Sequence, residues 1–264
     1  MSQHHVRISA HRGGGGPGIP VTRQIFEAAV ATDAEYVELD IRRTSDGVLV
    51  VHHGARIGRW GPRLRDLTYE RLGELTLHRV PRVPDVLALI AGHAVGHLDL
   101  KEAGYEDEVV ALAMETLGPG GFVVTTVEAR SISHIRRRFP GVLTALSLGH
   151  AGDQAVRLMR SHSCGRDAMR RIRACGAHWL AVNHRLAGTD VLAACAAHGI
   201  PCMVWTVNAA AHMTRFLADP RITVLVTDHP LRALHLRAGL TESPALGIGS
   251  GGIGGGGIRI RRRR

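Results

Sequence analysis

The feature that most constrains the fold is a regular alternation of short, β-branched apolar segments with longer helix-like segments, running from about Arg7 to about Arg237. Such alternation predicts a parallel sheet, because a helical crossover returns each strand in the same direction. Eight repeats favour a closed (β/α)₈ barrel over an open sheet, and 264 residues suit one domain of this kind. The expected strands are residues 6–11, 36–44, 95–101, 122–127, 143–148, 178–183, 202–207 and 222–228.

One segment interrupts the repeat after the second expected strand. Asp46-Gly47 predicts a tight turn, followed by a return strand that carries the adjacent pair His52 and His53. Residues 54–82 delay the next helix, so we expect a small insertion over the barrel mouth.

The C-terminal end differs in composition from the rest. The last helix is expected to end at Gly239, which leaves residues 1–240 as a TIM-barrel domain. Residues 241–264 are rich in glycine and arginine and cannot bury enough apolar surface to offset the entropy of ordering, so we expect a disordered tail. An arginine cluster of this kind is compatible with nucleic acid or acidic lipid, but a solvated tail is the simpler interpretation and nucleic acid is not an expected partner.

Charge and hydropathy narrow the class of protein further. The tail has five arginines and one glutamate, so it accounts for +4 of the net charge of +10, and the body keeps a modest excess of +6. This excess favours an anionic small-molecule substrate. The chain has no run of about 18 apolar residues and no apolar leader at its start, which predicts a cytoplasmic protein without stable membrane insertion. The sequence leaves the oligomeric state open.

Ionisable side chains occupy one face of three expected strands. Side chains alternate between faces along a strand, so Glu38 and Asp40 lie opposite apolar neighbours. The same holds for Asp99 and Lys101 on the next barrel strand and for Arg7 and His11 on the first. A solvated antiparallel sheet would explain one such strand. In a parallel barrel the polar face points inward, where ionisable groups must be paired, bound to metal or placed at the open end.

Three carboxylates, Glu38, Asp40 and Asp99, are therefore expected to converge at the barrel mouth. They repel one another unless a cation lies between them, and an all-oxygen ligand set suits Mg²⁺ or Ca²⁺. We expect one divalent cation at this position. A network of these carboxylates with lysine and arginine, without metal, is the alternative.

The end of the first strand adds groups that bind phosphate and transfer protons. Arg12 offers a planar fork of donors to phosphate oxygens, and Lys101 is a compact second cation. His11, together with one histidine of the pair His52 and His53, could serve as general acid and base. The glycines that follow Arg12 allow backbone amides to approach an anion, although this run matches no established phosphate-loop pattern.

With these residues in order, the chain resembles the glycerophosphodiester phosphodiesterase family over roughly residues 7–235. The departures are GIPVTRQ where the family has PENT, Asp99 where it usually has glutamate, and Gly54 where it usually has aspartate. The matching segments are His11-Arg12-Gly13, Glu38 with Asp40, Thr44 through Asp46-Gly47 to His53, Asp99 with Lys101, Trp205 to Asn208, and Thr227-Asp228 with Pro230.

The resemblance implies a phosphoric diester hydrolase that cleaves a glycerophosphodiester to an alcohol and sn-glycerol 3-phosphate with a divalent metal. The resemblance selects His53 as the partner of His11 in acid/base catalysis. It implies that the substrate's own glycerol hydroxyl attacks the phosphorus. It also suggests that the inward-facing Trp205 contacts the glycerol or alcohol group. Asn208 and Asp228 are expected to support loops. Two alternatives remain open, namely a sphingomyelinase D-like or lysophospholipase D-like enzyme and a non-catalytic barrel that binds anionic partners through its tail.

Overall fold

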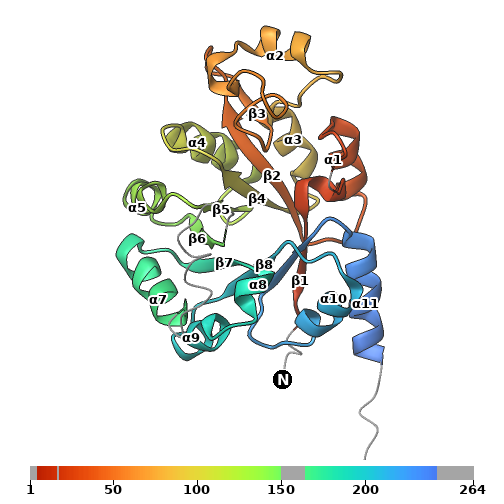
Figure 1. Ribbon diagram of the computed structural model, residues 1–264, viewed down its shortest axis with the longest axis vertical. Coiled ribbons are helices and arrows are strands. Elements are labelled where there is room, and N and C mark those ends of the chain that lie inside the picture. Colours follow the sequence, from red (N-terminus) through yellow and green to blue (C-terminus); the bar gives the residue numbers. More distant parts are fainter. Residues whose placement is uncertain (1–4, 17, 150–163, 243–264) are drawn as a thin grey trace, which may run out of the picture.

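The computed structural model describes residues 5–16, 18–149 and 164–242, and it contains the predicted closed barrel of eight parallel strands (Figure 1). The first strand pairs with both the second and the last, which closes the barrel. All eight expected strands are present. They are β1 (Arg7–Ala10), β2 (Tyr36–Arg43), β4 (Val95–Leu100), β5 (Phe122–Thr126), β6 (Leu143–Leu148), β7 (Trp179–Asn183), β8 (Cys202–Trp205) and β9 (Val224–Thr227).

Helices surround the barrel as an outer layer (Figure 1). Their ends follow from local chemistry: in α4, three acidic residues occupy the first turn, and Gly118 follows the last residue with a φ of 75° that favours glycine. The helices are α1 (Arg23–Val30), α2 (Tyr69–Leu75), α3 (Val83–Ile90), α4 (Glu106–Leu117), α5 (Ala129–Arg138), α7 (Cys164–Cys175), α8 (His184–Ala187), α9 (Val191–Ala197), α10 (Ala210–Leu217) and α11 (Pro230–Glu242), with 3₁₀ turns η1 (His11–Gly14) and η2 (Leu64–Asp66).

The core has two parts because each strand has two faces. The outward faces pack against the helices, and a smaller cluster that includes Tyr36, Val123 and Met203 fills the inside of the barrel. Trp205 packs against this inner cluster, so it faces inward as predicted. Alternation from Met203 through Trp205 also predicts an inward Val207, but Val207 belongs to the outer core because β8 ends at Trp205.

The insertion begins as predicted but takes a different position. Strand β3 (Leu49–Val51) returns antiparallel to β2 after the Asp46-Gly47 turn, with Val51 opposite Ile41. The residues beyond it fold into η2 and α2 on the rim of the barrel beside β3, rather than across the mouth (Figure 1). They pack around their own small apolar cluster, centred on Leu64 and Leu72, which holds them to the side.

The C-terminal prediction needs one correction. Helix α11 continues through Gly239 to Glu242, because Gly239 does not take the positive φ that ends helices at several other glycines of this chain. The expected disordered tail lies, from residue 243 onward, outside the described residues. Within residues 5–16, 18–149 and 164–242, no helix has both the length and the apolar character needed to cross a bilayer.

Candidate active site at the barrel mouth

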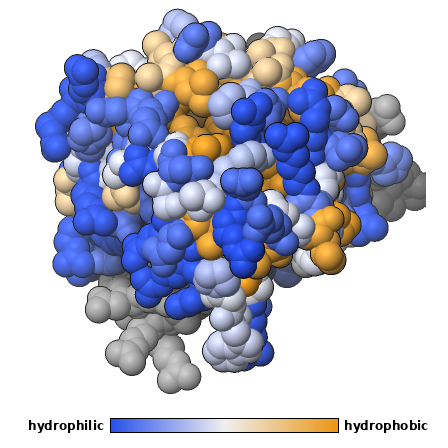
Figure 2. All heavy atoms as spheres, turned by 90° about the horizontal axis from the view of Figure 1, so that it is seen from above, coloured by the Kyte–Doolittle hydropathy of each residue, from blue (hydrophilic) through white to orange (hydrophobic). Residues whose placement is uncertain are grey.

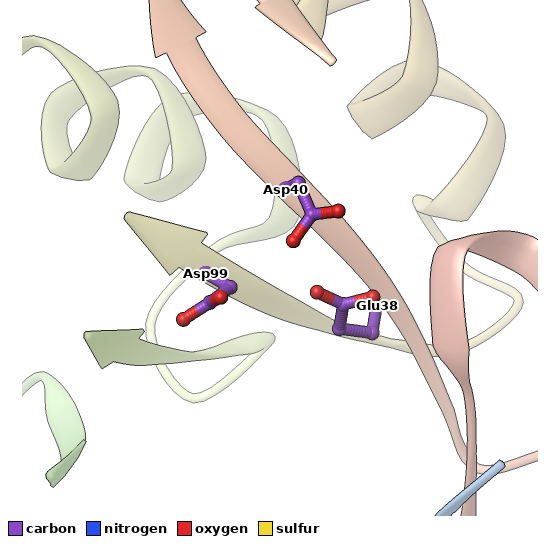
Figure 3. A group of neighbouring side chains, drawn as sticks. All are labelled: Glu38, Asp40 and Asp99. Carbon is purple, nitrogen blue, oxygen red and sulfur yellow. The ribbon is translucent and has the colours of Figure 1, made fainter. Parts of the chain in front are cut away.

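The three predicted carboxylates meet at one point of the mouth (Figure 3). Strands β2 and β4 are neighbours, and their register places Asp40 directly beside Asp99 and Glu38 beside His97. One carboxylate oxygen from each of Glu38, Asp40 and Asp99 lies within 4.8 Å of the others. The prediction that strand alternation brings them together is therefore confirmed.

Burial and neighbouring charge act in opposite ways on two of these carboxylates. Burial, followed by the charge of Asp40, raises the pKa of Glu38 to about 7. Burial also favours the neutral form of Asp40, but Lys101, His53 and Arg12 outweigh it and hold the pKa of Asp40 well below its usual range. The cluster thus contains a protonatable carboxyl beside a firmly ionised one.

Two cations stand beside Asp40. Lys101 Nζ is 2.6 Å from Asp40 Oδ1 and also contacts Asp99, and Arg12 Nε is 2.8 Å from Asp40 Oδ2. Burial alone would lower the pKa of Lys101, but the surrounding carboxylates raise it above its usual value, so the lysine is charged. Both predicted phosphate-binding cations therefore lie at the acidic cluster.

The donor set fits a hard divalent cation. Asp40 Oδ1 is buried and lies 2.6 Å from the Lys101 ammonium. A carboxylate oxygen has two lone pairs, so Oδ1 can also face an ion, and three converging carboxylates are what an oxygen-ligated ion such as Mg²⁺ or Ca²⁺ requires. A bound cation would also keep Glu38 ionised, since a nearby positive charge reverses the effect of burial on its pKa.

Two imidazoles flank the cluster, and each is anchored by a carboxylate. His11 Nδ1 donates to Asp228 Oδ1 at 2.7 Å, which leaves Nε2 directed toward Glu38, 3.9 Å from its Oε2. His53 Nδ1 donates to Asp40 Oδ2 at 3.0 Å. Because a carboxylate can only accept, both Nδ1 atoms carry hydrogen, and both Nε2 atoms remain for chemistry.

The structure separates the adjacent pair of histidines. His53 lines the mouth cavity with about half of its side chain exposed, whereas His52 turns aside and its Nδ1 donates to the carbonyl oxygen of Gly54 at 2.9 Å. A Cβ on Gly54 would come within 2.9 Å of the Arg56 carbonyl oxygen, so this turn excludes the aspartate that the family usually has there.

The loop after β1 is shaped by close backbone contacts. Arg12 has a φ of 49°, and its amide donates to Glu38 Oε2 at 2.8 Å. Gly13 and Gly14 also have positive φ, and a Cβ on Gly13 would meet the Ile25 side chain at 2.7 Å. The loop thus binds a buried carboxylate with its backbone while the Arg12 side chain faces Asp40.

A cavity of about 410 Å³ opens at this point. Trp205 lines this cavity, and so do most of the other predicted site residues, namely His11, Arg12, Glu38, His53, Asp99 and Lys101. Sequence reasoning missed Ser147, Asn183 and Arg185, which match no motif and come from β6, β7 and α8. Thr206 also lines the cavity, although the matching segment Trp205 to Asn208 did not indicate this.

Asp228 was expected to support a loop, but the structure makes it the partner of His11. Burial would raise its pKa, but the hydrogen bond and charge of His11, together with Asn208 and Arg12, outweigh this and lower it, so Asp228 is an ionised acceptor. Asn208 in turn donates to Asp228 Oδ2 and accepts from the Asp228 amide at 3.0 Å. The segment Thr227-Asp228 in the sequence was the available signal, although it did not indicate which histidine Asp228 contacts.

A second hydrogen-bonded series lies below Asp99. Thr125 Oγ1 donates to Asp99 Oδ1 at 2.8 Å, so it must accept from His97 Nε2 at 3.2 Å, and His97 Nδ1 then accepts from Ser9 Oγ at 3.1 Å. Burial lowers the pKa of His97 to about 4, which keeps this imidazole neutral. The series fixes the position of a carboxylate that is one methylene shorter than the glutamate usual in the family.

The fold and the site together define a class of protein. It is a (β/α)₈ barrel with its candidate active site at the carboxyl ends of the strands. There, an acidic cluster that could bind a metal ion lies beside two histidines and two basic side chains. Residues 11–232 match the profile of the Glycerophosphoryl diester phosphodiesterase family. The chain belongs to this family, whose members are hydrolases.

Individual relatives agree with this placement. A glycerophosphodiester phosphodiesterase of Bacillus subtilis is 23% identical over 269 residues, covering 87% of this chain and 86% of that protein. The structure of an Oleispira antarctica phosphodiesterase in complex with the product sn-glycerol-3-phosphate has a TM-score of 0.71 at 15% identity, covering 88% of this chain and 96% of that one. A shorter match, to the mouse lysophospholipase D GDPD3, is 34% identical over 74 residues, or 28% of this chain and 22% of that protein.

Proposed function

We propose that this protein hydrolyses glycerophosphodiesters to an alcohol and sn-glycerol 3-phosphate, using a divalent cation and two histidines. The observation that carries the proposal is the convergence of the three carboxylates with two imidazoles, each held at Nδ1 by a carboxylate, all at one cavity. The membership of the family and the product named for the Oleispira antarctica structure support the substrate class.

Glu38, Asp40 and Asp99 are the residues that would hold the cation. A bound Mg²⁺ or Ca²⁺ supplies positive charge that stabilises the phosphate oxygens as negative charge develops on them. The ion identity is left to experiment, because the ligand set is compatible with either.

Arg12 and Lys101 are proposed to hold the phosphodiester. Both side chains line the cavity and both contact Asp40, so an incoming phosphate would share their charge with that carboxylate. Arg12 can offer two parallel donors to two oxygens, which orients the phosphate, and Lys101 adds a point charge. Trp205 lines the same cavity and is proposed to contact the glycerol or alcohol moiety.

His11 and His53 are proposed to move the protons. One imidazole Nε2 removes the proton from the substrate's glycerol hydroxyl as it attacks phosphorus, and the other protonates the oxygen of the leaving alcohol, which leaves a cyclic phosphate. Water then opens this ring with the two histidines in exchanged roles, which gives sn-glycerol 3-phosphate. Asp228 and Asp40 keep Nδ1 of each ring protonated, so that the Nε2 atoms stay available for these transfers. His11 is the more enclosed of the two rings, while His53 is half exposed on the rim.

The experiment is hydrolysis of glycerophosphocholine by the full chain, with Mg²⁺, with Ca²⁺ and with EDTA. We expect release of sn-glycerol 3-phosphate that EDTA abolishes and added metal restores, and loss of that activity in Glu38→Gln with the fold intact. If no divalent metal supports turnover, the barrel is non-catalytic and the proposal is wrong. If Glu38→Gln keeps wild-type activity, Glu38 is not a ligand.

Hydrolysis of a lysophospholipid to a lysophosphatidic acid is the second candidate, and the local match to mouse lysophospholipase D GDPD3 favours it. The same assay with lysophosphatidylcholine in place of glycerophosphocholine compares the two. A higher kcat/KM for the lysophospholipid would make it the better substrate class.

A further inference from the structure

The rim of the barrel carries a basic hairpin that the proposed reaction does not use. We define this rim hairpin as residues 54–65, directly after His53. Its two arms are joined by an antiparallel bridge between Arg56 and Arg63 and by backbone hydrogen bonds from Ile57 to Pro62 and from Leu64 to Ala55, each 3.0 Å long. The hairpin is therefore a built element, with residues 58–61 at its tip.

The tip exposes an aromatic side chain. Trp60 is 84% exposed, although tryptophan is normally well buried, and the guanidinium of Arg59 stacks on it at 5.0 Å from the ring centroid. Gly61 is required beside it, because a Cβ there would lie 2.0 Å from the Ile57 carbonyl oxygen. The tight turn thus holds Trp60 outward, where Arg59 stacks on its ring and most of the side chain stays exposed.

The charge of the rim hairpin has one sign. It contains four arginines and no acidic residue. Arg65 is 3.8 Å from the exposed Asp66, and among the described residues Arg56, Arg59 and Arg63 form no ion pair. Most of this positive charge is therefore available to a partner.

The hairpin lies beside the entrance to the proposed active site. Arg56, Arg63 and Arg65 line a second, shallower cavity of about 470 Å³ together with Glu102, the residue after Lys101. Seen from the end of the molecule that carries α2, hydrophilic residues cover most of the surface, with exposed apolar residues among them (Figure 2).

Exposed aliphatic side chains also occur at the mouth end of the barrel, where the strands have their carboxyl ends. Ile19, in the connection after β1, is 56% exposed, and Leu231, in the first turn of α11 after β9, is 68% exposed, so both lie at the carboxyl ends of the strands. At the opposite end, the exposed large apolar residues Met114, Leu143 and Leu240 reach only 37%, 36% and 39%. The mouth therefore combines positive charge with an apolar rim.

We propose that the mouth of the barrel docks on an anionic lipid surface, with Trp60 at the polar–apolar boundary and the hairpin arginines on the headgroups. Tryptophan favours that boundary, and each arginine near an anionic bilayer adds favourable energy. Ile19 and Leu231 favour lipid over nucleic acid, because aliphatic side chains offer bases no ring on which to stack. Docking is peripheral and does not depend on the proposed hydrolysis.

The test is co-sedimentation of the full chain with phosphatidylcholine vesicles, with and without phosphatidylglycerol. We expect binding to the anionic vesicles only. Trp60→Ala should weaken partitioning about tenfold, from the apolar area lost. Arg59→Ala/Arg63→Ala should weaken it roughly 25-fold, at about fivefold for each arginine.

The control is Arg137→Ala/Arg138→Ala, which removes the same charge from the last turn of α5 at the opposite end of the barrel. It should change partitioning less than about twofold, since these side chains face away from the docked surface. If the control weakens binding as much as the hairpin pair, the attraction comes from net charge and the proposal is wrong. The proposal is also wrong if Trp60→Ala binds anionic vesicles as strongly as wild type. It is wrong as well if the protein binds no vesicles but binds DNA, and Arg59→Ala/Arg63→Ala loses that DNA binding.

Discussion

Replacing Asp228 with asparagine tests the proposed role of His11, because it should change which ring nitrogen of His11 carries the hydrogen. Asp228 Oδ1 accepts from His11 Nδ1, and its other oxygen accepts from the Asn208 amide. The orientation of Asn208 is fixed, because its Oδ1 accepts from the Asp228 backbone amide at 3.0 Å and from Thr227 Oγ1 at 3.3 Å. In Asp228→Asn the new carbonyl oxygen must therefore face Asn208, and the new NH₂ group must face His11.

An amide donor opposite Nδ1 forces that nitrogen to accept, so the hydrogen of His11 moves to Nε2, the atom proposed to transfer protons. A hydrogen bond to a charged group is worth about 1.5–3 kcal/mol, and a buried donor left facing another donor costs about 1–3 kcal/mol. The productive tautomer then becomes less stable by about 2.5–6 kcal/mol, a factor of roughly 10²–10⁴. We expect kcat to fall by that factor.

The assay is steady-state hydrolysis of glycerophosphocholine by Asp228→Asn, with circular dichroism to establish folding. KM should change little, because Asp228 is not among the described residues that line the cavity. The double variant Asn208→Asp/Asp228→Asn should regain part of the rate, since a carboxylate at position 208 accepts from the new NH₂ group and returns its carbonyl oxygen to His11. A kcat near wild type in the single variant, or no recovery in the double variant, would refute the tautomer argument.

Three further predictions concern other parts of the chain. His11→Ala and His53→Ala should each lower kcat about 10²–10⁴-fold, while His52→Ala stays within a few-fold of wild type; the reverse order for the two neighbouring histidines would exchange their roles. Truncation after Glu242 should leave activity and the melting temperature nearly unchanged, and a large loss of either would show that the tail contributes to the barrel. Burial favours a higher pKa of Glu35, but hydrogen bonds from the Ile8 amide and its other partners outweigh burial and lower this pKa. The ionised Glu35 therefore stabilises the folded protein at neutral pH, and this stabilisation disappears as the pH falls through the lowered pKa. Glu35→Gln should therefore cost about 1–3 kcal/mol at neutral pH and less in acid, as measured by urea denaturation, and a pH-independent cost would contradict this.

Much of the fold could be predicted because its determinants are local. The period of the apolar residues marked all eight barrel strands, and alternation along β2 and β4 placed Glu38, Asp40 and Asp99 on one face. Local patterns failed where the backbone departs from regular geometry. Alternation does not extend past the end of β8 to Val207, and a glycine ends a helix only if its φ becomes positive, which Gly239 does not do.

The sequence by itself therefore determined the barrel, the meeting of the three carboxylates and the presence of Lys101 and Arg12 beside them, since strand order and a two-residue period suffice for this. Alternation could not choose between His52 and His53; the family resemblance selected His53, and in the structure His53 lines the cavity while His52 binds the Gly54 carbonyl oxygen. Only the tertiary structure paired His11 with Asp228, because these residues are 217 positions apart and meet when β9 closes the barrel against β1. Contacts of this kind depend on closure of the whole barrel, and no local pattern in the sequence encodes them.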